Sequence, residues 1–316
     1  MISKQPKYDI HRHMGGSISP ETVWKIIEET GSYHIASSPA EVRNRMTYSN
    51  GDTRTFSAFL EKLSILDNIP WPDWAIDLAI SQICEDIKSE GIDHCDLSFS
   101  VDKYVRGGLW RLGDALLFIK DRYKYHAARC GITIKLLLSL AYHSARPNQL
   151  KVASIISDRD LSNCVDGLDL VGDEINFDPS FYWPIIKRWR DAGKITRAHV
   201  GELFGTGHHV KMAIDLGVSK IAHGIRGSAQ DIELATKRGI VFDLALHSNM
   251  YTGVTSNIRK HPLSKMIDIG AVITLNTDDP IQFDCTLADE FELALSTGLA
   301  TEQQLERIMD NAKLPS

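Results

Sequence analysis

Three histidine-containing motifs and a pair of aspartates, well separated in this sequence, have side chains that could form a catalytic site together. They are His11-Arg12-His13, His199-Val200-Gly201-Glu202, His223-Gly224 and Asp278-Asp279. Each follows a short apolar run that is typical of a buried strand. Imidazole nitrogens and carboxylate oxygens are the ligands of hydrolytic zinc sites, which keep one position for a water molecule and lower its pKa to about 7. The pattern therefore predicts a mononuclear metal-dependent hydrolase.

The position of each residue within its motif indicates what it could do. His11 and His13 are two residues apart on an extended strand, so their imidazoles point to the same face. His199 can bind the metal, while Glu202 follows a turn at Gly201 and faces the substrate. The motifs therefore supply metal ligands together with a catalytic partner.

One carboxylate and one further histidine complete this set. Asp278 can supply a carboxylate ligand, and His223 is then left as a base or an electrostatic partner for the water. Lys135 lies early in its strand rather than at its end, so we find no lysine that could bridge two ions. We therefore expect one metal ion per chain.

Apolar runs and amphipathic segments alternate along the chain. The predicted strands are 8–13, 92–99, 132–141, 165–170, 195–199, 220–223, 240–246 and 272–276, and the predicted helices are 74–89, 109–128, 148–157, 184–191, 210–216, 232–238 and 263–269. This alternation predicts a parallel sheet, and its eight units predict an α/β fold, the (β/α)8 TIM barrel, with catalytic groups at the C-terminal strand ends. An open doubly wound sheet is the alternative, but no Gly-x-Gly-x-x-Gly fingerprint follows the first strand.

The connection between the first two strands, roughly residues 18–91, is longer than a simple turn from strand to helix. Its segment 55–63 has apolar residues at positions that would line one face of a helix. We interpret this insertion as a helical lid over the barrel mouth that excludes water. The alternative is an extra helix packed on the side of the barrel. We expect residues 1–316 to form one barrel domain that carries the insertion.

Composition and charge limit the classes of molecule that this protein could bind and the compartment in which it could work. The formal net charge of −6, a pI of about 6.1 and the lack of a basic run argue against nucleic acid. The five cysteines are odd in number and far apart, so we expect reduced thiols in the core. With no apolar signal segment at the N-terminus and no run long enough to span a bilayer, we expect a cytoplasmic enzyme that acts on a small molecule, as a monomer or a homo-oligomer.

Six motifs in one order resemble the adenosine deaminase family of the amidohydrolase superfamily, from near residue 7 to near residue 313. The resemblance implies a zinc-bearing barrel that hydrolytically deaminates an aminopurine nucleoside or nucleotide and releases ammonia. The motifs are His11-Arg12-His13-Met14-Gly15-Gly16-Ser17, Gly167-Leu168-Asp169-Leu170-Val171-Gly172-Asp173-Glu174, His199-Val200-Gly201-Glu202, Ile221-Ala222-His223-Gly224, Ser248-Asn249 with Thr252-Gly253, and Leu275-Asn276-Thr277-Asp278-Asp279-Pro280.

The resemblance also implies roles for single residues. Glu202 would be protonated and donate to the ring nitrogen beside the reacting carbon, and His223 would orient and deprotonate the attacking water. Asp279 and the Gly172 backbone N–H would hold other ring nitrogens. The implied zinc ligands are His11, His13, His199 and Asp278, and the residues implied to contact or gate the substrate are His13, Gly15, Phe56, Phe59, Leu60 and Leu63.

The first motif departs from the family pattern. Adenosine-specific members carry Asp two residues after the second histidine, where it contacts the sugar 5′-hydroxyl, and this chain has Gly15. Selectivity that depends on a buried hydroxyl partner weakens when that partner is absent. A bulkier, absent or phosphorylated 5′ substituent becomes possible, as does another heterocycle such as a free purine base or a pterin. A catalytically silent binding protein is the third alternative.

Three other histidines have no partner that their spacing defines. We interpret His247 as a polar residue at a strand end rather than a substrate contact. His208 and His209 follow Gly207 at a predicted helix start, and we expect both to be exposed.

Overall fold

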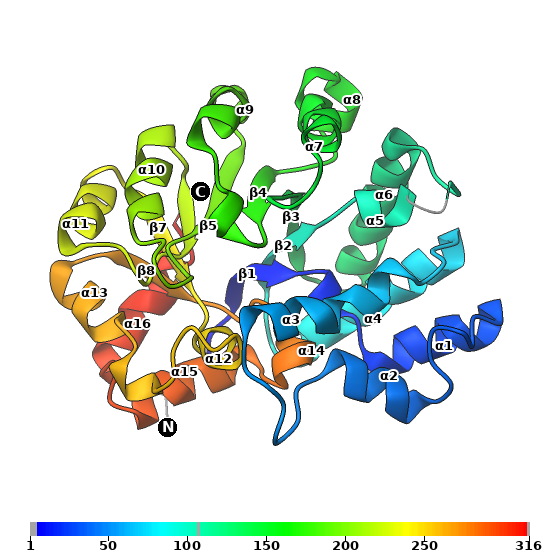
Figure 1. Ribbon diagram of the computed structural model, residues 1–316, viewed down its shortest axis with the longest axis horizontal. Helices are drawn as coiled ribbons and strands as arrows, with labels where there is room; N and C mark the ends of the chain where they lie inside the picture. The colour runs from blue at the N-terminus through cyan, green and yellow to red at the C-terminus, as the bar shows by residue number, and fades with distance from the viewer. Residues whose placement is uncertain (1–4, 106–107, 315–316) are drawn as a thin grey trace.

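Eight parallel strands in chain order form the centre of the molecule (Figure 1). The computed structural model describes residues 5–105 and 108–314; residues 1–4, part of the N-terminal segment in which we predict no signal peptide, lie outside the described residues. The strands are β1 Tyr8–His13, β2 His94–Phe99, β3 Thr133–Ala141, β4 Gly167–Val171, β5 Ile195–Val200, β6 Lys220–His223, β7 Val241–Leu244 and β8 Val272–Leu275.

The last strand meets the first and closes the barrel. Each strand pairs in parallel with the next from β1 to β8. Just beyond β8, the Asp278 backbone N–H donates to the His11 carbonyl at 2.9 Å, and the His13 N–H donates to the Asp278 carbonyl at 2.8 Å. The predicted (β/α)8 barrel is therefore confirmed, and the open sheet is not formed.

Helices surround the strands (Figure 1), and further helices precede the first predicted helix and follow the last one in the chain. They are α1 Pro20–Thr30, α2 Pro39–Met46, α3 Phe56–Leu63, α4 Asp73–Ser89, α5 Asp102–Val105, α6 Leu112–Cys130, α7 Arg146–Ala153, α8 Arg159–Ser162, α9 Pro179–Asp191, α10 His208–Leu216, α11 Ala229–Lys237, α12 Leu246–Tyr251, α13 Leu263–Ile269, α14 Pro280–Phe283, α15 Leu287–Ser296 and α16 Glu302–Asn311, with short 3-10 turns Gly15–Ser17, Ser64–Asp67, Ser154–Ser157, Glu174–Asn176 and Ile258–Lys260. Among the described residues, no helix combines the length and the apolar character that crossing a bilayer needs.

Several element boundaries differ from the sequence prediction, and two of the differences have an identifiable hydrogen bond behind them. Helix α9 begins at Pro179 rather than at residue 184, because the Asp178 side chain caps it and accepts from the Ser180 backbone N–H at 3.0 Å. Strand β7 ends at Leu244 rather than at residue 246, because the distant Glu290 carboxylate accepts the Leu246 N–H at 2.6 Å and begins helix α12 there.

The barrel interior below the mouth is a network of paired charges. Arg197 reaches the Asp169 carboxylate at 2.6 Å and Asp243 at 3.6 Å, and Lys220 reaches Asp96 at 3.2 Å. All five side chains are buried. Taking these charges out of water is costly, and leaving one without its counter-ion is more costly still, so the network ties the strands together beneath the polar mouth.

Candidate active site

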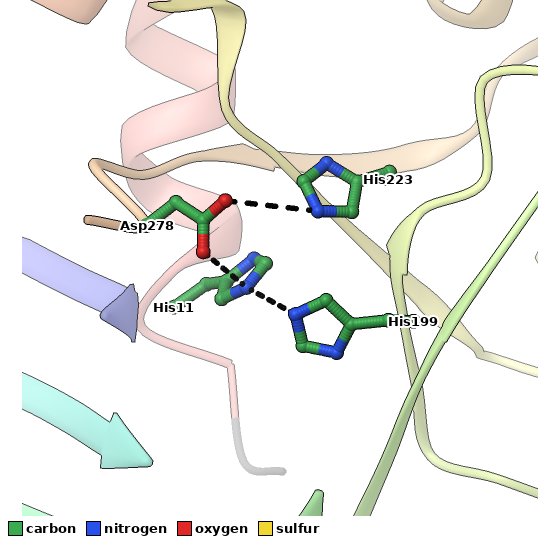
Figure 2. A group of neighbouring side chains, drawn as sticks. All are labelled: His11, His199, His223 and Asp278. Carbon is green, nitrogen blue, oxygen red and sulfur yellow. Dashed lines mark hydrogen bonds and ion pairs between the residues drawn. The ribbon is translucent and has the colours of Figure 1, made fainter. Parts of the chain in front are cut away.

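The predicted histidines and Asp278 converge at the C-terminal end of the barrel. Figure 2 shows His11, His199, His223 and Asp278 pointing toward one another, from β1, β5, β6 and the segment after β8. One potential ligand atom of each lies within 4.8 Å of the others. His13 joins them, since its Nε2 is 3.1 Å from Asp278 Oδ1. The fold thus brings together side chains that are up to 267 positions apart in sequence.

The spacing of the donor atoms fits one metal ion. The Nε2 atoms of His11, His13 and His199 are separated by 3.0, 3.2 and 3.3 Å, and Asp278 Oδ1 is 3.3 Å from the His11 Nε2. Tetrahedral zinc with bonds of 2.0–2.1 Å separates its ligands by about 3.3 Å. Nitrogen lone pairs this close repel one another unless a cation lies between them, so the donor set fits a divalent ion.

Hydrogen bonds on the far side of two rings orient these lone pairs inward. His199 Nδ1 lies 3.0 Å from the Leu170 carbonyl and 3.2 Å from Asp169 Oδ1. His11 Nδ1 lies 3.4 Å from the Asp243 carbonyl. Acceptors at Nδ1 place the ring proton there and leave Nε2 free to bind a metal. Asp169 belongs to a quoted motif, yet its contact with His199 could not be predicted because the two residues lie on different strands.

Backbone strain is concentrated at this site. In the described part of the chain, the non-glycine residues with φ in the left-handed region are His223 at 60°, Asp278 at 63° and Asp284 at 47°. Such a conformation costs about 1–3 kcal/mol and persists only where the surrounding structure enforces it. At His223 and Asp278 it turns the side chain from the strand end toward the shared centre.

A buried carboxylate holds the turn that carries Glu202. Glu174 accepts the backbone N–H groups of Gly201, Glu202 and Leu203 at 2.6, 2.7 and 2.7 Å. The Thr206 hydroxyl donates to it at 2.7 Å. These bonds fix the turn after β5, so Glu174 determines where the Glu202 side chain lies. Its role was not predicted, because the partners are about 30 positions away in sequence.

His209 corrects the prediction that both residues of the His208-His209 pair are exposed. His208 is exposed, but His209 is buried and its Nδ1 lies 3.1 Å from Glu174 Oε2. The first turn of α10 packs directly against the 3-10 turn that carries Glu174, which covers the second histidine. His247 lies in the first turn of α12 rather than at a strand end, and its Nδ1 is 2.8 Å from Glu290 Oε1.

Two carboxyl groups beside the metal-ligand cluster favour the protonated form. Burial raises the pKa of Glu202 well above its usual range, and the Asp278 charge raises it further. Burial and then the Asp278 charge raise the pKa of Asp279 to about 8. Asp279 Oδ1 is also buried without a hydrogen-bond partner among the described residues. Both groups can therefore donate a proton or a hydrogen bond to a ligand near pH 7.

A cavity of about 340 Å³ opens over this centre, which is large enough for a small ligand. Helix α3 lines it, so this part of the insertion lies over the mouth rather than on the barrel side. The lining includes every residue that the resemblance implies for substrate contact or gating: His13, Gly15, Phe56, Phe59, Leu60, Leu63, Gly172 and Asp279.

A closed parallel barrel with acid-base groups and metal-type donors at its C-terminal mouth defines the class: a barrel enzyme that works at its strand ends. A model of the adenosine deaminase family matches residues 6–315. The chain belongs to the adenosine deaminase family and is a hydrolytic deaminase.

Individual relatives are distant in sequence but match over almost the whole chain. An adenosine deaminase from Edwardsiella ictaluri is 27% identical over 95% of this chain and 90% of its own. An adenine deaminase structure from Arthrobacter aurescens superposes with a TM-score of 0.84 at 19% identity, covering 98% of this chain and 93% of that one. A zinc-bound amidohydrolase structure from Burkhoderia ambifaria gives 0.84 at 22% identity, covering 97% and 84%. The two structures show the same fold.

Proposed function

We propose that this chain is a zinc-dependent deaminase of an aminopurine nucleoside without a 5′-phosphate. The observation that carries the proposal is the convergence of the three Nε2 atoms and Asp278 on one centre, with Glu202 and Asp279 beside it in one cavity. The fold supports the same assignment, because barrel enzymes place their chemistry at this end.

The residues proposed to hold the metal are His11, His13, His199 and Asp278. A bound zinc ion supplies a nucleophile at neutral pH by lowering the pKa of water. Asp278 suits the ligand role because, although burial opposes its ionisation, contact with His11 keeps its pKa well below the usual range.

Two protonated carboxyl groups would then engage the purine. Purine ring nitrogens without a proton are hydrogen-bond acceptors, and a neutral carboxyl group can donate to one. Glu202 lies beside the metal-ligand cluster, with its Oε2 3.7 Å from His223 Nε2. We assign it to donate to the ring nitrogen beside the reacting carbon, which makes that carbon more electrophilic. We assign Asp279 and the Gly172 N–H to other ring nitrogens.

The cavity wall beside Gly15 supports an uncharged substituent rather than a phosphate. Within 4 Å, a Cβ at position 15 would meet methyl carbons of Leu63 and Leu66, each at 3.5 Å. Lys103 also lines the cavity, but its ammonium group is 3.3 Å from the Asp67 carboxylate. A phosphate would have to displace an existing ion pair to gain that charge.

Helix α3 supports the proposal that the insertion acts as a lid. Its Phe59 ring lies 5.7 Å from Phe283 of α14, and Phe283 lies 5.7 Å from Tyr251 of α12. This aromatic contact holds the helix over the cavity. Exclusion of water at that position would strengthen the hydrogen bonds made to the ring.

Ammonia release from a panel of substrates tests the proposal. We expect turnover of adenosine and of 5′-deoxyadenosine with similar kcat/KM, and at least about 100-fold lower kcat/KM for AMP. Gly15→Asp should raise the preference for adenosine over 5′-deoxyadenosine by about 10-fold, because it adds an acceptor for the hydroxyl. Gly15→Ala controls for the added carbon alone. Turnover of only free bases or pterins, or of none of these compounds by metal-loaded protein, would refute the proposal.

A further inference from the structure

A line of three buried polar side chains begins at His223 and runs away from the cavity. His223 Nδ1 is 3.1 Å from Asn249 Nδ2, and Asn249 Oδ1 is 3.1 Å from His261 Nε2. The Leu263 backbone N–H donates to His261 Nδ1 at 3.2 Å. His223, Asn249 and His261 are each no more than 3% exposed, so water does not compete for these bonds.

The backbone sets the direction of the first bond. A backbone N–H can only donate, so His261 Nδ1 must accept from Leu263 and carries no proton. Burial, followed by the nearby Arg226 charge, lowers the pKa of His261 to about 3, so the ring is neutral near pH 7. A neutral imidazole has one ring proton. It must therefore be on Nε2, which faces Asn249.

The orientation of the amide follows from that proton. His261 Nε2 donates, so the Asn249 atom facing it must be the carbonyl oxygen, and the amide nitrogen is left to face His223. A flipped amide would put an N–H group against the N–H of His261. The Asn249 amide therefore donates to His223 Nδ1, which leaves the neutral His223 ring with its proton on Nε2.

We propose that Asn249 and His261 are positioning residues that fix His223 in the tautomer with its proton on Nε2. That atom faces the reaction centre, 3.7 Å from both Asp278 Oδ2 and Glu202 Oε2. Two acceptor-bearing groups on that side suit an N–H donor.

The tautomer changes what His223 can do. Resting on the deaminase function proposed above, His223 presents an N–H to the attacking oxygen and holds it by donating a hydrogen bond. It does not act as the base that the sequence resemblance implies, because Nε2 has no free lone pair in this tautomer. A histidine held in the wrong tautomer can lose most of its catalytic function although its geometry is intact.

Three variants test the direction of these hydrogen bonds. Asn249→Asp replaces the donor by an acceptor, so His223 should move its proton to Nδ1. His261→Gln keeps an N–H group near the position of Nε2 and should preserve the original tautomer. His261→Leu removes the donor altogether and should leave Asn249 free to adopt both orientations.

Nitrogen-15 NMR of the full-length, zinc-loaded protein with labelled histidine reads the tautomer directly, with the His223 signal assigned from its absence in His223→Gln. We expect protonated Nε2 in the wild type and in His261→Gln, protonated Nδ1 in Asn249→Asp, and a mixture in His261→Leu. Circular dichroism and metal content identify any variant that fails to fold.

Kinetics supply the second readout. We expect Asn249→Asp to lower kcat about 100-fold with KM changed less than about threefold, and His261→Gln to keep kcat within about fivefold. A wild-type His223 protonated on Nδ1, or an unchanged tautomer in folded Asn249→Asp, would overturn the inference. If the tautomers are as expected but no aminopurine is turned over, the inference holds and the proposed function fails.

Discussion

Replacing Gly16 by alanine should displace Asp279 without changing any charge or polar group. Gly16 follows the first histidine motif, and a Cβ built there overlaps the Oδ1, Cγ and Cβ atoms of Asp279. Because the Asp279 Cβ itself is overlapped, rotation of the carboxylate cannot relieve the contact. Non-bonded heavy atoms prefer about 3.5–4.0 Å, so the two backbones must separate by roughly 1 Å.

The expected losses follow from that displacement. Overpacking of a close contact costs about 1–3 kcal/mol of folding free energy. A shift of about 1 Å in a group that positions substrate costs about 100-fold in rate. We therefore expect Gly16→Ala to lower kcat/KM for adenosine about 100-fold while reducing stability by only about 1–3 kcal/mol, so that the protein stays folded at 25 °C.

Steady-state ammonia release and urea unfolding measure the two effects on the same preparation. Gly113→Ala, in helix α6, is the matched control. Within 4 Å, a Cβ at position 113 meets only the methyl groups of Leu161, at 3.5 Å. It should leave kcat/KM unchanged and add up to about 1 kcal/mol of stability. If Gly16→Ala keeps kcat/KM within threefold of the wild type, the close approach between Gly16 and Asp279 does not position the substrate.

Three further predictions concern the supports of the site. Glu174→Gln should lower kcat by about 10- to 100-fold and stability by about 1–3 kcal/mol, because an amide cannot accept from all the N–H groups that the carboxylate binds. A kcat within twofold of the wild type would contradict this prediction. As a control, the variant Asp231→Asn, in a helix cap at the surface, should leave kcat unchanged. Burial disfavours the charged form of Asp96, but Lys220 and His94 outweigh burial and lower the pKa of Asp96 to about 2, below its value in the unfolded chain. The ionised Asp96 therefore stabilises the fold by on the order of 2 kcal/mol above about pH 4, and this stabilisation is lost as the pH falls toward 2. Urea unfolding should show this acid loss in the wild type and a smaller one in Asp96→Asn. Removing the metal with a chelator should abolish ammonia release and lower the unfolding temperature, and one equivalent of Zn²⁺ should restore both; full activity in protein with no detectable metal would exclude the zinc assignment.

The glycines and prolines near helix ends show the limit of reading boundaries from sequence. Helix α13 runs over residues 263–269 as predicted, because Gly270 at φ 86° ends it locally. Helix α9 begins at the local Asp178–Pro179 cap, which is a better start signal than Pro184 inside the helix. Local signals locate an element well when its cap is adjacent in sequence. They fail where a boundary depends on a partner distant in sequence: β7 ends at Leu244 because Glu290, 44 positions from Leu246, accepts the Leu246 N–H and begins α12 there.

The sequence by itself determined the alternation of strand and helix and the placement of His11, His199, His223 and Asp278 at strand ends. In a parallel barrel all strand ends of one kind meet at one mouth, so this placement was enough to predict that the side chains converge. The types of these residues and their spacing can be taken directly from the sequence.

Only the tertiary structure decided how these groups are held and oriented. Glu174, in the 3-10 turn after β4, accepts backbone N–H groups of the Glu202 turn, and Asn249 and His261 orient His223 from beyond β7. The side of a ring that carries a proton depends on which donor or acceptor lies about 3 Å away, and such partners are brought together by folding rather than by neighbouring positions in sequence. The strained φ angles at His223 and Asp278 have the same origin, because only the closed barrel can enforce them.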